Sequence, residues 1–208
     1  MKVHYKKLFI VPTLFFGIAL LNAIPNDGQE SSEEVQKFNT LLEGAQKGEA
    51  LAQYGLGIYF ERGIGTKQDS EQAFNWYKKS ADQDFGPALG DLGSYYRKGL
   101  VVKQDPVMAF NLFKRAAEAE YPNAQLNLAN CYKLGFGTAS DPVQALTWYE
   151  KAAQAGLASA QLSLGLCYYH GSGITRDHDK AFFWLKKAEE QGVKPNEVLL
   201  LQFGDDTE

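Results

Sequence analysis

A ladder of glycines spaced 36 residues apart is the feature that most constrains the fold of this chain. An aspartate follows each glycine six positions later, and alanine, leucine and aromatic columns keep the same phase. A repeat of this length is typical of a solenoid, in which each unit buries its apolar face only against its neighbours. The columns are Gly63, Gly99, Gly135 and Gly171; Asp69, Asp105, Asp141 and Asp177; Ala52, Ala88, Ala124 and Ala160; Leu56, Leu92, Leu128 and Leu164; and Phe60, Tyr96, Tyr132 and Tyr168.

Each unit is predicted to contain two helices joined by a short connector. In the first unit, an apolar stripe with helical spacing predicts a helix over about 50–62. Gly63 and Gly65 can take the left-handed backbone angles that end a helix, and the Asp69 side chain can cap the next one. A second stripe then follows. The two stripes comprise Ala52, Leu56, Tyr59 and Phe60, and then Ala73, Trp76, Tyr77, Ser80 and Ala81.

These patterns predict an all-α fold, a superhelical solenoid of helix-turn-helix repeats with four 36-residue units over 48–192. A helix over 32–47 is expected to cap the N-terminal end. At the other end, 193–203 reads as half of a fifth unit with Leu200 in the leucine column, and 204–208 as a disordered tail. The repeats form one domain with a continuous elongated core.

The first 23 residues have the layout of a secretory signal peptide, with a basic start, an apolar run from Leu8 to Leu21 and a small residue at Ala23. The apolar run of 14 residues is short for a membrane span. A polar linker over 24–31 follows. We therefore expect a secreted or periplasmic protein. The alternative is a membrane-anchored protein with an uncleaved signal, because Leu21 is not ideal near a cleavage site.

The fourth unit resembles a known repeat family. The string from Ala158 to Gly173, followed by Asp177 and Trp184, is similar to the Sel1-like repeat, a relative of the tetratricopeptide repeat with a longer connector. The resemblance covers about 45–192. It implies a right-handed α-superhelix that serves as an adaptor for protein partners.

The second unit departs from that pattern. Val101 replaces a connector glycine, Leu112 replaces the tryptophan, and Gly90 interrupts the first helix. These departures leave open the geometry of the second connector.

Charge and composition exclude some partners. The formal net charge is −4, and removal of a signal peptide would take away three lysines and no acids. An acidic chain without a stripe of Lys and Arg disfavours nucleic acid, and after signal cleavage it disfavours a membrane surface as well. Most aromatic residues lie in repeat columns and are expected in the core, not on a stacking surface.

No catalytic residue, cofactor site or metal site is predicted, because the chain lacks the usual nucleophile, phosphate-loop and zinc motifs. His170 and His178, with neighbouring Asp177 and Asp179, leave a weak metal-chelating alternative.

Two cysteines, Cys131 and Cys167, stand one repeat apart on equivalent helices, whose axes should be roughly 8–10 Å apart. A disulfide needs Cα atoms within about 7 Å. Two buried free thiols are expected, with a strained disulfide as the alternative.

A candidate binding face lies beside the core stripe of the first helices, which should line the concave side. Positions equivalent to 55, 58 and 62 differ between units, as expected of a surface free of packing constraints, and suit an extended peptide or helix. Simple solvation is the alternative reading. The candidate residues are Arg62, Asp91, Ser94, Lys98, Asn127, Asn130, Ser163 and His170.

The sequence therefore favours a non-enzymatic scaffold that binds a protein or peptide. A secreted hydrolase acting on cell-wall or β-lactam substrates is the alternative, and a purely structural spacer is a third possibility.

Overall fold

The computed structural model describes residues 32–193, in which nine helices follow one another. The expected signal peptide, linker and tail lie outside this range, as does the expected C-terminal half-repeat beyond Val193. The helices are α2 (Ser32–Gln46), α3 (Ala50–Arg62), α4 (Ser70–Ala81), α5 (Gly86–Lys98), α6 (Pro106–Glu118), α7 (Pro122–Leu134), α8 (Pro142–Gln154), α9 (Ala158–His170) and α10 (His178–Glu190).

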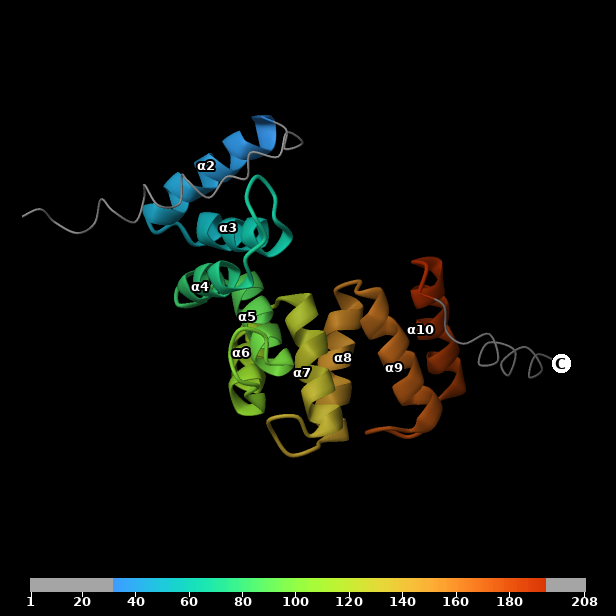
Figure 1. The fold of residues 1–208 in the computed structure, drawn as a ribbon. Helices are drawn as coiled ribbons and strands as arrows, with labels where there is room; N and C mark the ends of the chain where they lie inside the picture. Colours follow the sequence, from blue (N-terminus) through green and yellow to red (C-terminus); the bar gives the residue numbers. More distant parts are fainter. Residues whose placement is uncertain (1–31, 194–208) are drawn as a thin grey trace, which may run out of the picture.

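Each helix packs against the helices before and after it in the sequence, and α5 also contacts α7. In Figure 1 the axes turn progressively from α2 at one end to α10 at the other. We call α3, α5, α7 and α9 the A helices, and α4, α6, α8 and α10 the B helices. The predicted all-α repeat fold is confirmed, and α2 covers the first A helix at the N-terminal end of the stack.

The predicted helix ends are also confirmed. Each A helix ends at its ladder glycine in the left-handed conformation, with φ of 69° at Gly63 and 73° at Gly171. The aspartate columns cap the B helices: Asp69 accepts hydrogen bonds from the N–H groups of Glu71 and Gln72, both at 3.0 Å. Asp105, Asp141 and Asp177 cap their helices in the same way.

The second unit keeps this geometry despite its departures. Helix α5 runs unbroken through Gly90, so the expected interruption is wrong. A Cβ at that position would lie 3.2 Å from the ring of Tyr121, so the glycine makes room for an aromatic side chain. Val101 takes the left-handed φ of 65°, and Asp105 N–H closes the connector on the Tyr96 carbonyl at 3.0 Å.

The core contains one column that the sequence analysis missed. Gly57, Gly93, Ala129 and Gly165 are equivalent positions on the A helices, and all four are buried. A Cβ on Gly57 would lie 2.6 Å from the Tyr77 ring. The three glycines therefore receive large side chains of the facing B helix, at Tyr77, Phe113 and Leu185.

The tryptophans contribute unequally to the core. Trp76 is buried, whereas Trp148 and Trp184 are half-buried. Lys151 Nζ lies 4.0 Å from the centroid of the Trp148 ring, and Lys79 sits over Trp76 in the same way at 3.8 Å. One face of each of these two rings therefore meets a cation.

Buried glutamines tie successive units together. The amides of Gln53, Gln125 and Gln161 each donate to a carbonyl eight residues earlier. The Oε1 atoms of Gln53 and Gln161 accept in turn from Gln83 and Gln191, both at 2.8 Å. Among the described residues, Gln125 Oε1 is buried without a partner, because Ala155 stands at the position of those donors.

Both cysteines are buried and free. Burial raises the pKa of Cys131 to about 11 and also raises the pKa of Cys167. Both side chains are therefore neutral thiols at physiological pH.

Candidate functional site

All eight predicted site residues lie on A helices. Arg62, Lys98 and His170 are exposed at the helix ends. The other five, Asp91, Ser94, Asn127, Asn130 and Ser163, are half-buried, and four of them, all except Asn127, accept or donate hydrogen bonds within the stack. The face is therefore less free of packing constraints than the sequence suggested.

One group of side chains on this face is an acid–tyrosine cluster, formed by Tyr54 and Glu61 of α3, Tyr77 of α4, and Asp91 and Tyr95 of α5. Tyr54 Oη donates to Asp91 Oδ2 at 3.0 Å. Glu61 accepts at 2.7 Å from Tyr77 and at 3.5 Å from Tyr95. Three phenols thus hold two carboxylates across three helices.

Burial sets the electrostatics of this cluster. It raises the pKa of Asp91, and the charge of Glu61 adds to that effect. The Tyr54 hydrogen bond and the positive charges of Lys98 and Arg62 act in the opposite direction. Burial also raises the pKa of Tyr95 to about 12. The phenols therefore remain protonated donors, and the free carboxylate lone pairs can accept from cationic or amide groups of a partner.

Only Asp91 of this cluster was predicted from the sequence. A signal for Glu61 was present, because its column continues with Arg97, Lys133 and Tyr169 and varies as strongly as the neighbouring column at 62. Tyr77 carries no such signal, because it belongs to a core column.

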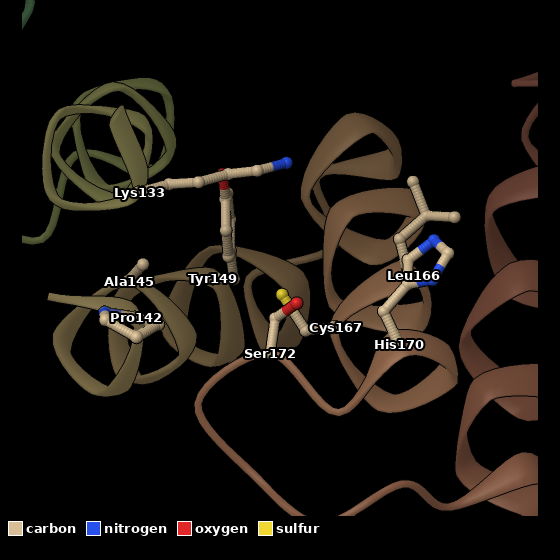
Figure 2. Close-up of a pocket in the computed structure, with 8 residues that line it drawn as sticks. All are labelled: Lys133, Pro142, Ala145, Tyr149, Leu166, Cys167, His170 and Ser172. Carbon is tan, nitrogen blue, oxygen red and sulfur yellow. The ribbon is translucent and has the colours of Figure 1, made fainter. Parts of the chain in front are cut away.

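A cavity of about 280 Å³ lies between α7, α8 and α9. In Figure 2, the Lys133 side chain extends from α7 over the Tyr149 ring towards α9, while Leu166 and His170 form the opposite wall. We call this cavity the Lys133 pocket. It is lined by Lys133, Pro142, Ala145, Tyr149, Leu166, Cys167, His170 and Ser172.

Three predicted residues lie at or beside the Lys133 pocket, and two of them, Asn130 and Ser163, meet at the Tyr149 hydroxyl. His170 lines the pocket, and Asn130 Oδ1 accepts from Tyr149 Oη at 2.6 Å. Ser163 approaches the same hydroxyl and lowers its pKa, although the larger effect of burial raises it. Asn127 joins neither group of side chains.

The pocket also places Cys167 near His170, a pair that sequence reasoning did not consider. Burial raises the pKa of the Cys167 thiol, and the charge of Lys133 opposes this only partly. A neutral thiol is a poor nucleophile. Within residues 32–193, no hydrogen bond joins this thiol to the imidazole.

The histidines do not form a recognisable metal centre in the described part of the chain. His170 and His178 pack on the Tyr169 ring, at centroid distances of 5.0 and 5.7 Å. No group of three His, Cys, Asp or Glu residues gathers there to hold an ion. Over residues 32–193, no helix combines the length and apolar character needed to cross a bilayer.

The fold and the repeated capping define an α-helical repeat solenoid. The chain belongs to the Sel1 repeat family, since the family model matches it four times, over 50–85, 87–121, 122–157 and 158–193.

Solved structures show the same fold. A Sel1 repeat protein from Oxalobacter formigenes is 32% identical with a TM-score of 0.71, over 75% of this chain and 62% of that one. A protective antigen of uropathogenic Escherichia coli strains is 38% identical with a TM-score of 0.74, over 81% of this chain and 35% of that one. An immunity protein from Pseudomonas aeruginosa, at 18% identity and a TM-score of 0.54, matches in fold alone over 94% of this chain and 81% of that one.

This chain therefore spans less than two thirds of each of the first two proteins. No curated protein matches it.

Proposed function

We propose that this chain is a non-enzymatic interaction scaffold that binds an extended segment of a partner protein along the face of its A helices. Asp91 carries the proposal. Its equivalents are Gly55, Asn127 and Ser163, so the repeat itself does not require a carboxylate there. A half-buried carboxylate with a raised pKa costs folding free energy, and such a cost is typical of functional positions.

Membership of the Sel1 repeat family supports this proposal, because stacked helical repeats form long surfaces that suit protein partners. We also propose that the protein acts in the secreted or periplasmic space, on the basis of the signal-like segment over 1–23. Fractionation of the native cell, together with the N-terminal residue of the purified protein, tests the location and the cleavage of the signal.

Site-specific crosslinking in the native cell tests the binding face. A photo-crosslinking amino acid at Asn127, on the A-helix face of α7, should capture a protein partner. The same amino acid at Asn111, an exposed position of α6, is the matched control. Equal capture at both positions, or capture only at Asn111, contradicts the proposed face. Absence of any captured protein favours the structural spacer.

Turnover of nitrocefin or muropeptides tests the hydrolase alternative. We expect no turnover, because the Cys167 thiol, which lines the same pocket as His170, is neutral. Turnover that is lost in a Cys167→Ser or Ser172→Ala variant overturns the scaffold proposal in favour of an enzyme.

A further inference from the structure

The Lys133 pocket is lined by a positive charge, although the chain as a whole is acidic. The sequence holds 25 Asp and Glu and 21 Lys and Arg residues, yet the pocket lining contains Lys133 and no carboxylate. Within the described residues, the Lys133 ammonium takes part in no ion pair or hydrogen bond. The pocket is therefore a positive site without an internal counter-charge.

Comparison with the first unit shows which group is missing. Glu61 is the equivalent of Lys133, and it accepts a hydrogen bond from Tyr77, the equivalent of Tyr149. In the third unit the tyrosine remains, but a cation replaces the carboxylate. Tyr149 donates to Asn130 instead, at 2.6 Å. The same repeat position therefore holds a negative charge in the first unit, at Glu61, and a positive charge in the third unit, at Lys133.

The size and walls of the pocket limit what it can hold. At about 280 Å³ it is smaller than most small-molecule sites, which occupy roughly 300–1,000 Å³. His170 and Ser172 contribute polar groups to the lining, whereas Leu166, Pro142 and Ala145 contribute apolar surface. A single side chain with a short aliphatic stem and a charged end fits this combination.

We propose that the Lys133 pocket receives a Glu or Asp side chain from the partner segment, an inference that rests on the proposed function. The ammonium of Lys133 pairs with the carboxylate, and His170 and Ser172 offer further donors. Leu166 packs against the aliphatic stem. The pocket thereby fixes the register of the segment on the A-helix face, because one anchor position specifies how the rest of an extended peptide lies.

Display of random twelve-residue peptides tests this proposal with the chain purified from cells that export it. The peptides are flanked on both sides, so that none has a free terminal carboxylate. Peptides retained by the wild-type protein should share Glu or Asp at one position. The Lys133→Met protein should lose that preference, and Lys133→Glu should prefer Lys or Arg. Lys78→Met, an exposed lysine of α4, is the matched control and should retain the acidic preference.

A retained peptide then supplies a quantitative test. Replacing its acidic residue with the amide should weaken binding to the wild-type protein at least roughly tenfold, the scale of one charge-assisted hydrogen bond, and should leave binding to the Lys133→Met protein unchanged. Circular dichroism and the melting temperature of each variant confirm that it is folded.

The outcomes separate the two proposals. Peptides that bind without an acidic preference, or that keep it in the Lys133→Met protein, overturn the pocket assignment and leave the scaffold in place. Retention of no peptide counts against both. A preference seen only in a second library with free C-termini overturns the side-chain assignment, because the pocket then takes a terminal carboxylate.

Discussion

At the scale of single residues, polar side chains distinguish one unit from the next while the apolar columns stay constant. Asp91 and Gln125 show this in opposite ways. Asp91 is a charge with a partner, Tyr54, on the candidate binding face. Gln125 is a neutral amide whose oxygen lacks a partner in the described structure. Asp91 and Gln125 each allow a test in which one substitution changes the free energy of unfolding in a direction that packing alone does not predict.

Asp91→Asn should raise the free energy of unfolding at pH 7. Burial raises the pKa of Asp91 in the folded chain, so the folded chain holds this proton more tightly than the unfolded chain does. Stability therefore falls as pH rises from the unfolded pKa, about 3.9, through the folded value. The new asparagine side chain can still accept the hydrogen bond from Tyr54. Because the substitution removes the buried charge, we expect the free energy of unfolding to rise by on the order of 1 kcal/mol.

Urea unfolding between pH 4 and pH 8 measures this effect. The gain should shrink at the acidic end, where the wild-type carboxyl is protonated. Glu43→Gln, at an exposed position of α2, is the control and should leave stability nearly unchanged. A loss of stability in Asp91→Asn at pH 7 contradicts the assigned cost of the charge.

Ala155→Gln should stabilise the chain by about 1 kcal/mol, because the new amide can donate to Gln125 Oε1 as Gln83 donates to Gln53. Ala119→Gln is the matched control. Its facing residue is Leu89, which offers no acceptor. Thermal unfolding of both variants makes the comparison, and an equal gain in both indicates a helix-end effect instead of the specific hydrogen bond.

At the scale of elements, the connectors determine how closely successive units approach. Gly65, Gly137 and Gly173 all take positive φ. A Cβ on Gly137 would overlap the carbonyl oxygen of Pro106, at the start of the preceding B helix. Glycine is needed there for conformation and for space. Val101, at the equivalent position of the second unit, takes the same positive φ although its side chain is β-branched.

Val101→Gly should stabilise the chain by about 1 kcal/mol, because a β-branched residue at a φ of 65° is strained. The reverse substitution, Gly137→Val, should destabilise it by more than that, since the connector must then move away from α6. Denaturant unfolding of the two variants tests both signs. A loss of stability in Val101→Gly would mean that the valine side chain contributes more by packing than it costs in strain.

At the scale of the whole molecule, the helices contact mainly their neighbours in sequence, so a local defect should remain local. Leu128→Ala leaves a cavity at a fully buried position of α7 and should cost about 2–5 kcal/mol. Hydrogen exchange should increase most in α6, α7 and α8, and least in α3. Leu134→Ala, in the same helix but 75% exposed, is the control. Equal loss of protection in every helix contradicts the solenoid account.

Charge distribution is a second property of the whole molecule. The first two A helices carry the carboxylates of Glu61 and Asp91, and α7 carries Lys133, which lines the Lys133 pocket. Arg62 and Lys98 also lie on the first two A helices, so that part of the face carries charges of both signs. An acidic anchor in the Lys133 pocket would therefore fix the register of a bound segment along this face.

The repeat period by itself determined the helices, their caps and their order, because these depend on contacts within a unit or between adjacent units. The predicted helix over about 50–62 is α3, and Asp69 caps α4 through N–H groups two and three residues away. Such local rules can be read directly from the spacing of residues.

Only the tertiary structure decided which polar side chains meet. Tyr54 reaches Asp91 across 37 positions of sequence, and Lys133 shares a cavity with His170 of another unit. These contacts between distant residues depend on the angle and the separation of the packed helices. Many side-chain contacts together determine that angle and that separation. The same packing explains why α5 continues through Gly90, where the Tyr121 ring occupies the space that a side chain would need.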